Sequence, residues 1–151
     1  MFREDSLCAI LSEIAKAQEM NMREGVKMLL ELPERDISIY TDPARLGQVV
    51  NNLINNAVKF TQKGSISLGC NLLDDGKVEI YVRDTGTGMS GEVLSHIFER
   101  FFKGDAFVQG TGLGLSICRM IIEKIGGEIG VTSEFGKGST FYFIIPCTEV
   151  D

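Results

Sequence analysis

Four asparagines stand within a six-residue segment that ends at Asn56, and a lysine follows at Lys59. An amide oxygen is a hard neutral ligand that suits Mg²⁺, and a nearby lysine suits a phosphate. On a helix, which turns by about 100° per residue, Asn52, Asn56 and Lys59 share one stripe beside the apolar face. Asn51 and Asn55 lie further round. Because asparagine is a poor helix former, this cluster favours a metal and phosphate site over an ordinary polar flank.

An aspartate followed by two glycines ends a strand-like run at residues 77–84. Asp84 has the same parity as the apolar side chains of this run, so its carboxylate points between the sheet and the helices. A buried carboxylate needs a hydrogen-bond donor, and a ligand amine would serve. Gly86 and Gly88 let the backbone approach a flat ring or a phosphate. The alternatives are a tight surface turn and a dinucleotide-binding loop, and the carboxylate beside a pyrophosphate disfavours the second.

A third chemical feature is the glycine-rich segment from Gly110 to Ile117, which runs into a predicted helix. Free N–H groups at the start of a helix bind anions. Lys103 begins the loop before this segment and is placed to reach a phosphate, whereas Phe98 and Phe101 are expected to pack in the core. The pattern therefore predicts a second phosphate-binding element, far along the chain from the asparagines.

The composition limits which kind of protein carries these residues. A chain of 151 residues, 44% of them hydrophobic, suffices for one domain with its own core. With 21 acidic and 15 basic side chains, the net charge is −6, which argues against non-specific nucleic-acid binding. No apolar run approaches the roughly 20 residues of a membrane span, and the N-terminus is not of the secretory type. The scattered cysteines are expected to be reduced thiols in a cytosolic protein.

The elements that must position these residues follow from periodicity, caps and turns. We expect helices over residues 5–20, 43–60, 90–98 and 112–125, and strands over residues 26–30, 37–40, 65–73, 77–84, 128–133 and 139–145. Strands in adjacent pairs, rather than in strict alternation with helices, imply a mixed sheet. The predicted fold class is α+β, a two-layer α/β sandwich whose mixed, mostly antiparallel sheet carries helices on one face.

In their order along the chain, the asparagine segment, the Asp84 loop, the phenylalanine-rich segment Ile97–Lys103 and the Gly110 loop resemble the N, G1, F and G2 boxes of histidine kinase ATP-binding domains. The resemblance extends from about Asp42 to Pro146. It implies the Bergerat-type ATP-binding fold that sensor kinases share with gyrase, mismatch-repair and chaperone ATPases, and it implies ATP and Mg²⁺ as cofactors.

The resemblance also implies a role for individual residues. Asn56 and its companion Asn52 match the Mg²⁺ ligands. The other implied site residues are Lys59 and Lys103 at the phosphates, Phe60 and Thr140 beside the nucleotide base, Asp84 with Gly86 and Gly88 at the adenine amino group, and Gly110, Gly112, Leu113, Gly114 and Leu115 in the phosphate loop. Asn52, Asn56, Lys59 and Lys103 form the catalytic set. Lys103 stands where an arginine is frequent in the family, and it keeps the charge without the guanidinium fork.

The function expected from the resemblance is the ATP-binding catalytic domain of a two-component sensor kinase. In hydrolytic relatives a glutamate serves as general base about where Asn52 stands, and an amide cannot take a proton from water, which favours a kinase. The phosphoacceptor histidine is expected on a separate dimerisation domain rather than at His96. The alternatives are a non-catalytic nucleotide-binding module and an anti-sigma-type serine kinase on the same fold.

The expected organisation is an N-terminal helix over residues 1–24 that leads from a dimerisation region outside this chain, an ATP-binding kinase domain over 25–147, and a tail over 148–151. The expected partners are that dimerisation domain and a response-regulator receiver domain, with no nucleic acid. The fragment is expected to be cytoplasmic, not membrane-embedded, and monomeric in isolation.

Overall fold

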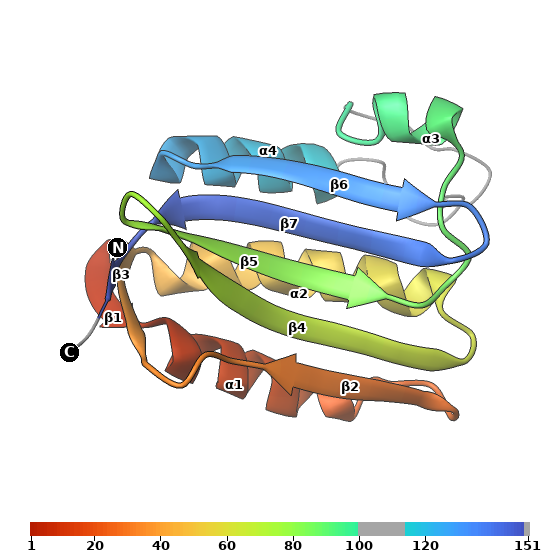
Figure 1. Cartoon of the computed structure of the whole chain (residues 1–151), viewed down its shortest axis with the longest axis horizontal. Coiled ribbons are helices and arrows are strands. Elements are labelled where there is room, and N and C mark those ends of the chain that lie inside the picture. The colour runs from red at the N-terminus through yellow and green to blue at the C-terminus, as the bar shows by residue number, and fades with distance from the viewer. Residues whose placement is uncertain (100–113, 150–151) are drawn as a thin grey trace.

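The computed structural model describes residues 1–99 and 114–149 of the chain. Its main sheet has the strand order β2-β4-β5-β7-β6, with β2 parallel to β4 and every other neighbouring pair antiparallel. These strands are β2 (Val26–Glu31), β4 (Gly64–Leu73), β5 (Lys77–Asp84), β6 (Glu128–Glu134) and β7 (Gly138–Pro146). The helices α1 (Leu7–Glu19), α2 (Pro43–Phe60) and α4 (Gly114–Ile125) cover one face of the sheet (Figure 1). The predicted two-layer α+β fold is confirmed.

A second, smaller sheet lies at one end of the sandwich. It has the order β1-β3-β8 and consists of β1 (Arg3–Ser6), β3 (Ile37–Thr41) and β8 (Thr148–Glu149). This sheet places β1 and β8, which are far apart in the sequence, on either side of β3 (Figure 1). The sequence predicted β3, but its local signals placed β1 partly in the first helix and β8 in a tail. Both strands depend on pairing with β3, a distant segment, and their own residues have no apolar alternation.

Helix α2 begins and ends as predicted, and a local signal marks its start. The Asp42 side chain accepts hydrogen bonds from the backbone N–H groups of Ala44 and Arg45 at 3.1 and 3.4 Å, and Pro43 occupies the first turn. The buried side chains of α2 form one apolar face, which consists of Leu46, Val49, Val50, Leu53, Ile54 and Ala57. Burial of this face holds α2 on the sheet, and each large side chain stabilises the fold by roughly 1.5–3 kcal/mol.

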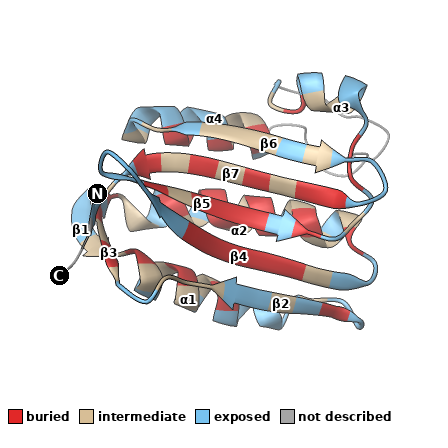
Figure 2. Ribbon diagram, viewed as in Figure 1, coloured by how far each residue is buried: buried red, intermediate tan, exposed pale blue. Residues whose placement is uncertain are grey.

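The hairpin β4–β5 carries Asp84 to its place. Its turn contains Asp75 and Gly76, whose φ angles of 65° and 70° match the twist of a short hairpin. The turn sets a register in which Leu73 pairs with Lys77 and Ile66 pairs with Asp84. The buried residues run along the central strands, whereas β2 at the edge is largely intermediate or exposed (Figure 2). Asp84 therefore ends a central, buried strand.

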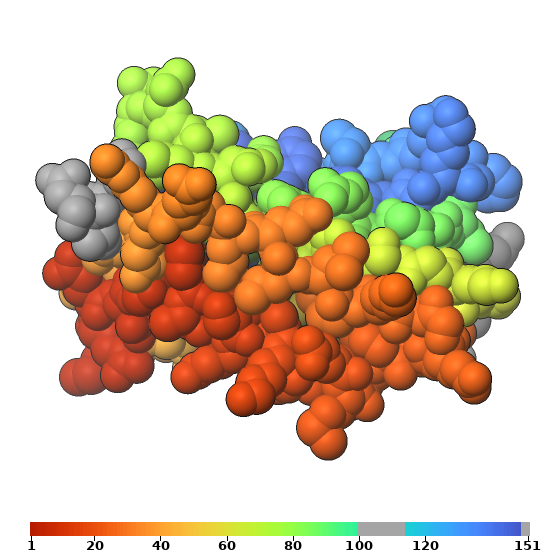
Figure 3. Space-filling model, turned by 60° about the horizontal axis from the view of Figure 1, so that its bottom comes forward, coloured from red at the N-terminus to blue at the C-terminus, as the bar shows by residue number. Residues whose placement is uncertain are grey.

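Helix α1 packs in the same core as α2 and the sheet, through Leu7, Leu11 and Ala15. With β2 it forms the surface along the β2 edge, coloured red to orange in Figure 3. The expected domain boundary after residue 24 stays a prediction. The short helix α3 (Gly91–His96) follows the Asp84 loop, with Ser90 as its N-cap. Across residues 1–99 and 114–149, no helix is long and apolar enough to cross a membrane.

Candidate functional site

The asparagines of α2 divide between two flanks of the helix, as the helical angles predict. On one flank, Gln18 of α1 donates its amide N–H to the side-chain oxygens of Asn51 and Asn55, at 2.8 and 3.4 Å. On the other flank, the amide nitrogen of Asn52 lies 3.7 Å from the sulfur of Cys118 in α4. This contact involves the amide nitrogen of Asn52. The amide oxygen of Asn52, which is the atom that a cation would need, takes no part in it.

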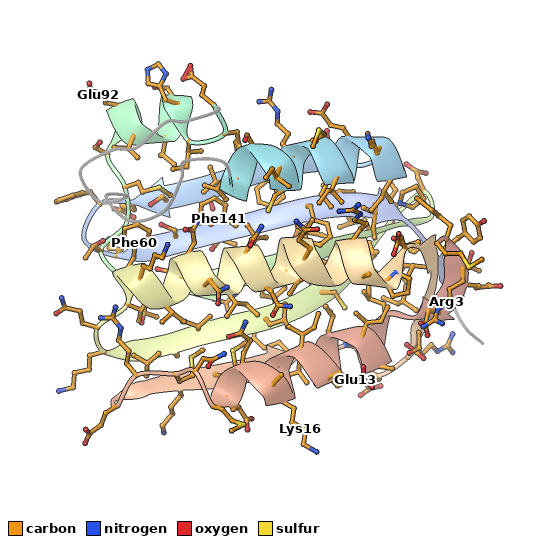
Figure 4. All side chains as sticks on the ribbon, turned by 180° about the vertical axis from the view of Figure 1, so that it is seen from behind. Arg3, Glu13, Lys16, Phe60, Glu92 and Phe141 are labelled. Atoms are coloured by element: carbon orange, nitrogen blue, oxygen red, sulfur yellow. The ribbon has the colours of Figure 1, made fainter. Side chains whose placement is uncertain are left out.

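The other predicted residues of α2 lie in its last two turns. Asn56 is half-buried and stands one turn after Asn52, and Lys59 is exposed. Phe60 is the last residue of α2, and its carbonyl oxygen accepts a hydrogen bond from the N–H of Thr87 at 3.2 Å. Figure 4 shows Phe60 at the end of α2 that is nearer to α3. The end of α2 is thus tied to the loop that follows β5.

The donors on α2 fit a magnesium ion that arrives with a phosphate. In the described part of the chain, no three His, Cys, Asp or Glu side chains gather as a metal site. Asn52 and Asn56 instead offer neutral amide oxygens, and Mg²⁺ characteristically combines few protein ligands with phosphate oxygens and water. The charge that balances the ion would then come from the ligand, with Lys59 one turn further along the helix.

Asp84 is the buried acid of the site, with 5% of its surface exposed. One carboxylate oxygen accepts the N–H of Gly86 at 2.9 Å. Burial raises the pKa of the Asp84 carboxyl, against the backbone N–H donors of Gly86 and Ser139, which lower it. A carboxylate so buried gains from any further donor, and an amine of a ligand is such a donor.

The two glycines after Asp84 allow close backbone contacts that no side chain would permit. A Cβ on Gly86 would lie 2.2 Å from the carbonyl oxygen of Phe60. Gly88 has a φ of +70°, and its Cβ would lie 2.2 Å from the carbonyl oxygen of Glu134. The loop is therefore held between the end of α2 and the β6–β7 turn. Phe60 and Gly86 both line a hollow of about 420 Å³ there.

Ser139, rather than Thr140, is brought to the side of Asp84. Ser139 pairs directly with Asp84, is 8% exposed, and shares the parity of Phe141, which packs in the core. Thr140 alternates to the opposite face of the sheet, where it pairs with Arg83 and Thr132. Thr140 is the residue that the family resemblance implied beside the base. The alternation of β7, with Phe141, Phe143 and Ile145 buried, carries the signal that could have found Ser139.

Ser133 is a second residue beside the site that the sequence did not predict. Its hydroxyl accepts the N–H of Met89 at 2.8 Å and donates to the carbonyl oxygen of Gly138 at 3.1 Å. The hydroxyl of Ser139 lies 2.8 Å away. Ser133 thus joins the end of the Asp84 loop to the β6–β7 hairpin and to the residue that faces Asp84.

Part of the predicted phosphate site lies outside the described residues. Lys103, Gly110, Gly112 and Leu113 all fall there, so their roles stay predictions. Gly114 is the first residue of α4, and Leu115 is buried at 8% exposure and packs in the core.

Comparison with known proteins gives the family of this chain. Residues 41–149 match the family model described as histidine kinase-, DNA gyrase B-, and HSP90-like ATPase. The sensor protein SrrB of Staphylococcus aureus is 44% identical over 132 residues, which cover 83% of this chain and 22% of SrrB. The chain thus spans about a fifth of the curated relatives that it matches.

Solved structures agree in fold and class. The catalytic domain of the histidine kinase ThkA is 34% identical with a TM-score of 0.85, covering 97% of this chain and 95% of that domain. Full-length ShkA in complex with AMPPNP is 31% identical with a TM-score of 0.89, covering 99% of this chain and 32% of ShkA. The chain therefore belongs to the histidine kinase-, DNA gyrase B- and HSP90-like ATPases. Within that family it is a histidine kinase-type, ATP-binding catalytic domain.

Proposed function

We propose that this domain binds Mg-ATP beside the second half of α2 and transfers the γ-phosphoryl group to a histidine on a separate dimerisation domain. The observation that carries the proposal is the buried Asp84, a carboxylate held at the end of a central strand with few donors of its own. The AMPPNP complex of ShkA, a solved structure that this chain resembles, supports a nucleotide as the ligand.

Asp84 accepts a hydrogen bond from the exocyclic amine of adenine in this proposal. Gly86 and Gly88 let the loop backbone pass close to the base, and Phe60 lies at the edge of the same loop. Ser139, opposite Asp84, takes the position beside the base that the resemblance assigned to Thr140. A guanine base presents an acceptor where adenine has its amine, so Asp84 makes the site selective for adenine.

Asn56 and Asn52 hold the metal ion, and Lys59 contacts the phosphates. Mg²⁺ supplies neutralisation of the charge on the β- and γ-phosphates. The Asn52 side chain is kept toward α4 by its contact with Cys118. As an amide it takes no proton from water, so the site lacks a general base at this position and favours transfer to another nucleophile over hydrolysis.

The acceptor and the downstream partner are parts of the same proposal. The likeness to SrrB, a sensor protein, supports a dimerisation domain as the acceptor and a response-regulator receiver domain as the next recipient of the phosphoryl group. We place the domain on the cytoplasmic side of its parent sensor, where ATP is available.

The test is transfer in trans. The chain is incubated with radiolabelled Mg-ATP and a histidine-containing dimerisation domain of a sensor kinase, and acid-labile label is expected on that domain. Labelling will be weak because no tether raises the effective concentration. Asn56→Ala should abolish it, whereas Gln48→Ala, an exposed amide on the same helix, should not. A chain that binds Mg-ATP but labels nothing would be a non-catalytic module, and acid-stable label would indicate a serine kinase.

A further inference from the structure

Gln18 is a buried amide at a position where α1 otherwise carries apolar side chains. The buried residues of α1 are Leu7, Leu11, Ala15 and Gln18, whose spacing defines one face of a helix. Gln18 is 5% exposed. Glutamine is mostly found on protein surfaces, and a buried amide needs hydrogen-bond partners. The partners of Gln18 therefore indicate why this position is polar.

The amide nitrogen of Gln18 bridges two successive turns of α2. It donates to the side-chain oxygen of Asn51 at 2.8 Å and to that of Asn55 at 3.4 Å. The amide oxygen of Gln18 accepts the side-chain N–H of Asn21 at 3.3 Å. This bond orients the Gln18 amide so that its nitrogen faces α2. One side chain of α1 thus holds one flank of α2 at two points.

Holding Asn51 and Asn55 also sets the direction of Asn52 and Asn56. Each of the latter follows one residue later, so it lies about 100° further round the same helix. Side-chain atoms about 6 Å from a helix axis move by about 1 Å when the helix rotates by about 10°. A misplacement of about 1 Å at a reacting group can cost about a hundredfold in rate. The opposite flank is held by Cys118, which also donates to the carbonyl oxygen of Val49 at 3.9 Å.

We propose that Gln18 is a positioning residue for the metal site: by bridging Asn51 and Asn55, it fixes the rotation of α2 at which Asn52 and Asn56 present their oxygens to the magnesium ion. The proposal rests on the proposed function, because it concerns the Mg²⁺ ligands named there. It gives the four asparagines of α2 two roles, with two residues holding the helix and two binding the ion.

The test compares ATP affinity in Mg²⁺ and in EDTA, by titration calorimetry on the nucleotide-free chain. Gln18→Met keeps the length of the side chain and removes its hydrogen bonds. ATP affinity in EDTA should stay within about twofold of the parent, because the Asp84 pocket is untouched, whereas the gain in affinity from Mg²⁺ should fall about tenfold, as is typical when a residue that orients metal ligands is lost. An equal gain in parent and variant would overturn the role of Gln18 alone. A parent that gains nothing from Mg²⁺ would overturn the metal part of the proposed function as well.

Ala15→Gly is the matched control for a loosened helix. Ala15 lies on the same buried face of α1, and it carries no group that hydrogen-bonds to α2. This variant should lower the urea midpoint of unfolding and leave the gain from Mg²⁺ unchanged. If it reduced that gain as much as Gln18→Met does, Gln18 would be merely structural and the proposal would fail.

A double-mutant cycle tests whether Gln18 acts through α2. Asn51→Leu removes the nearer acceptor and should reduce the gain from Mg²⁺ about as much as Gln18→Met. The double variant should be no worse than either single variant, because both changes break the same bridge. Independent losses that multiply to about a hundredfold would contradict the proposal.

Discussion

Asp84 and Ser139 face each other across β5 and β7 with both side chains on the helical side of the sheet. The two strands approach closely here, since a Cβ on Gly138 would lie 2.1 Å from the carbonyl oxygen of Asp84. The pairing buries the carboxylate, and the burial raises its pKa. Asp84 is therefore held in a costly environment that a ligand amine would relieve.

Asp84→Asn should weaken ATP binding. The substitution replaces a carboxylate that only accepts by an amide that can turn a donor toward the adenine amine. Loss of a charge-assisted hydrogen bond costs about 1.5–3 kcal/mol, which corresponds to a roughly tenfold to hundredfold weaker affinity in titration calorimetry. GTP serves as the control ligand and should bind the parent poorly. Equal affinity of the parent for ATP and GTP would show that Asp84 does not bind the adenine amine.

The same substitution should stabilise the nucleotide-free domain at neutral pH. Folding raises the pKa of Asp84 above its ordinary 3.8. The stability that the protonated carboxyl contributes is therefore fully present below the ordinary pKa, and it is lost as the pH rises through the raised pKa of the folded state. The parent therefore bears the cost of a buried charge at about pH 7, and the variant does not. In urea unfolding, Asp84→Asn should have the higher midpoint at about pH 7, and the difference should shrink toward about pH 4.

Saturating ATP should reverse this order, because a ligand stabilises the form that binds it more tightly. The parent should then unfold at higher urea than Asp84→Asn. A variant that is less stable than the parent at neutral pH without nucleotide would contradict this prediction. It would show that hydrogen bonds in the free domain offset the cost of burying the Asp84 carboxylate.

Gly88→Ala should damage both the fold and the nucleotide site. At Gly88 the φ of +70° disfavours any L side chain, and the new Cβ would meet a backbone carbonyl, which cannot move aside cheaply. We expect a loss of about 1–3 kcal/mol in the free energy of unfolding, together with weaker ATP binding. Gly91→Ala is the control, since nothing lies within 4 Å of its Cβ and it opens α3. If the two variants have the same free energy of unfolding, a side chain at position 88 causes no strain and the argument from the close backbone contact is wrong.

Features that were predicted correctly from the sequence depend on local signals. The limits of α2 follow from Asp42, Pro43 and its apolar face, and the β4–β5 hairpin follows from its Asp-Gly turn. β1 and β8 were missed because nothing in residues 3–6 or 148–149 marks a strand until β3 lies beside them. Strand formation there is decided by a partner far away in the sequence.

The site shows the same division between local and distant causes. Alternation along β5 predicted that Asp84 points toward the helices, and the structure places it there. The same alternation along β7 puts Ser139 on the side of Asp84 and Thr140 on the opposite face of the sheet, a difference between neighbouring positions that a motif match does not register. Gln18 could not be found from α1 alone, because its two acceptors belong to α2 and meet it only through packing.

His96 should not be phosphorylated by the isolated chain. It is the single histidine of the sequence, and it ends α3 with its Nδ1 2.5 Å from a carboxylate oxygen of Glu99. Transfer requires a nucleophile in line with the γ-phosphate, and a phosphoryl group on His96 would add negative charge beside Glu99. With radiolabelled Mg-ATP, the isolated chain should bind nucleotide without gaining acid-labile label. His96→Gln should transfer to an added dimerisation domain as well as the parent does. Acid-labile label on the isolated chain that disappears in His96→Gln would mean that the acceptor lies within this domain, and the division of labour between two domains would be incorrect.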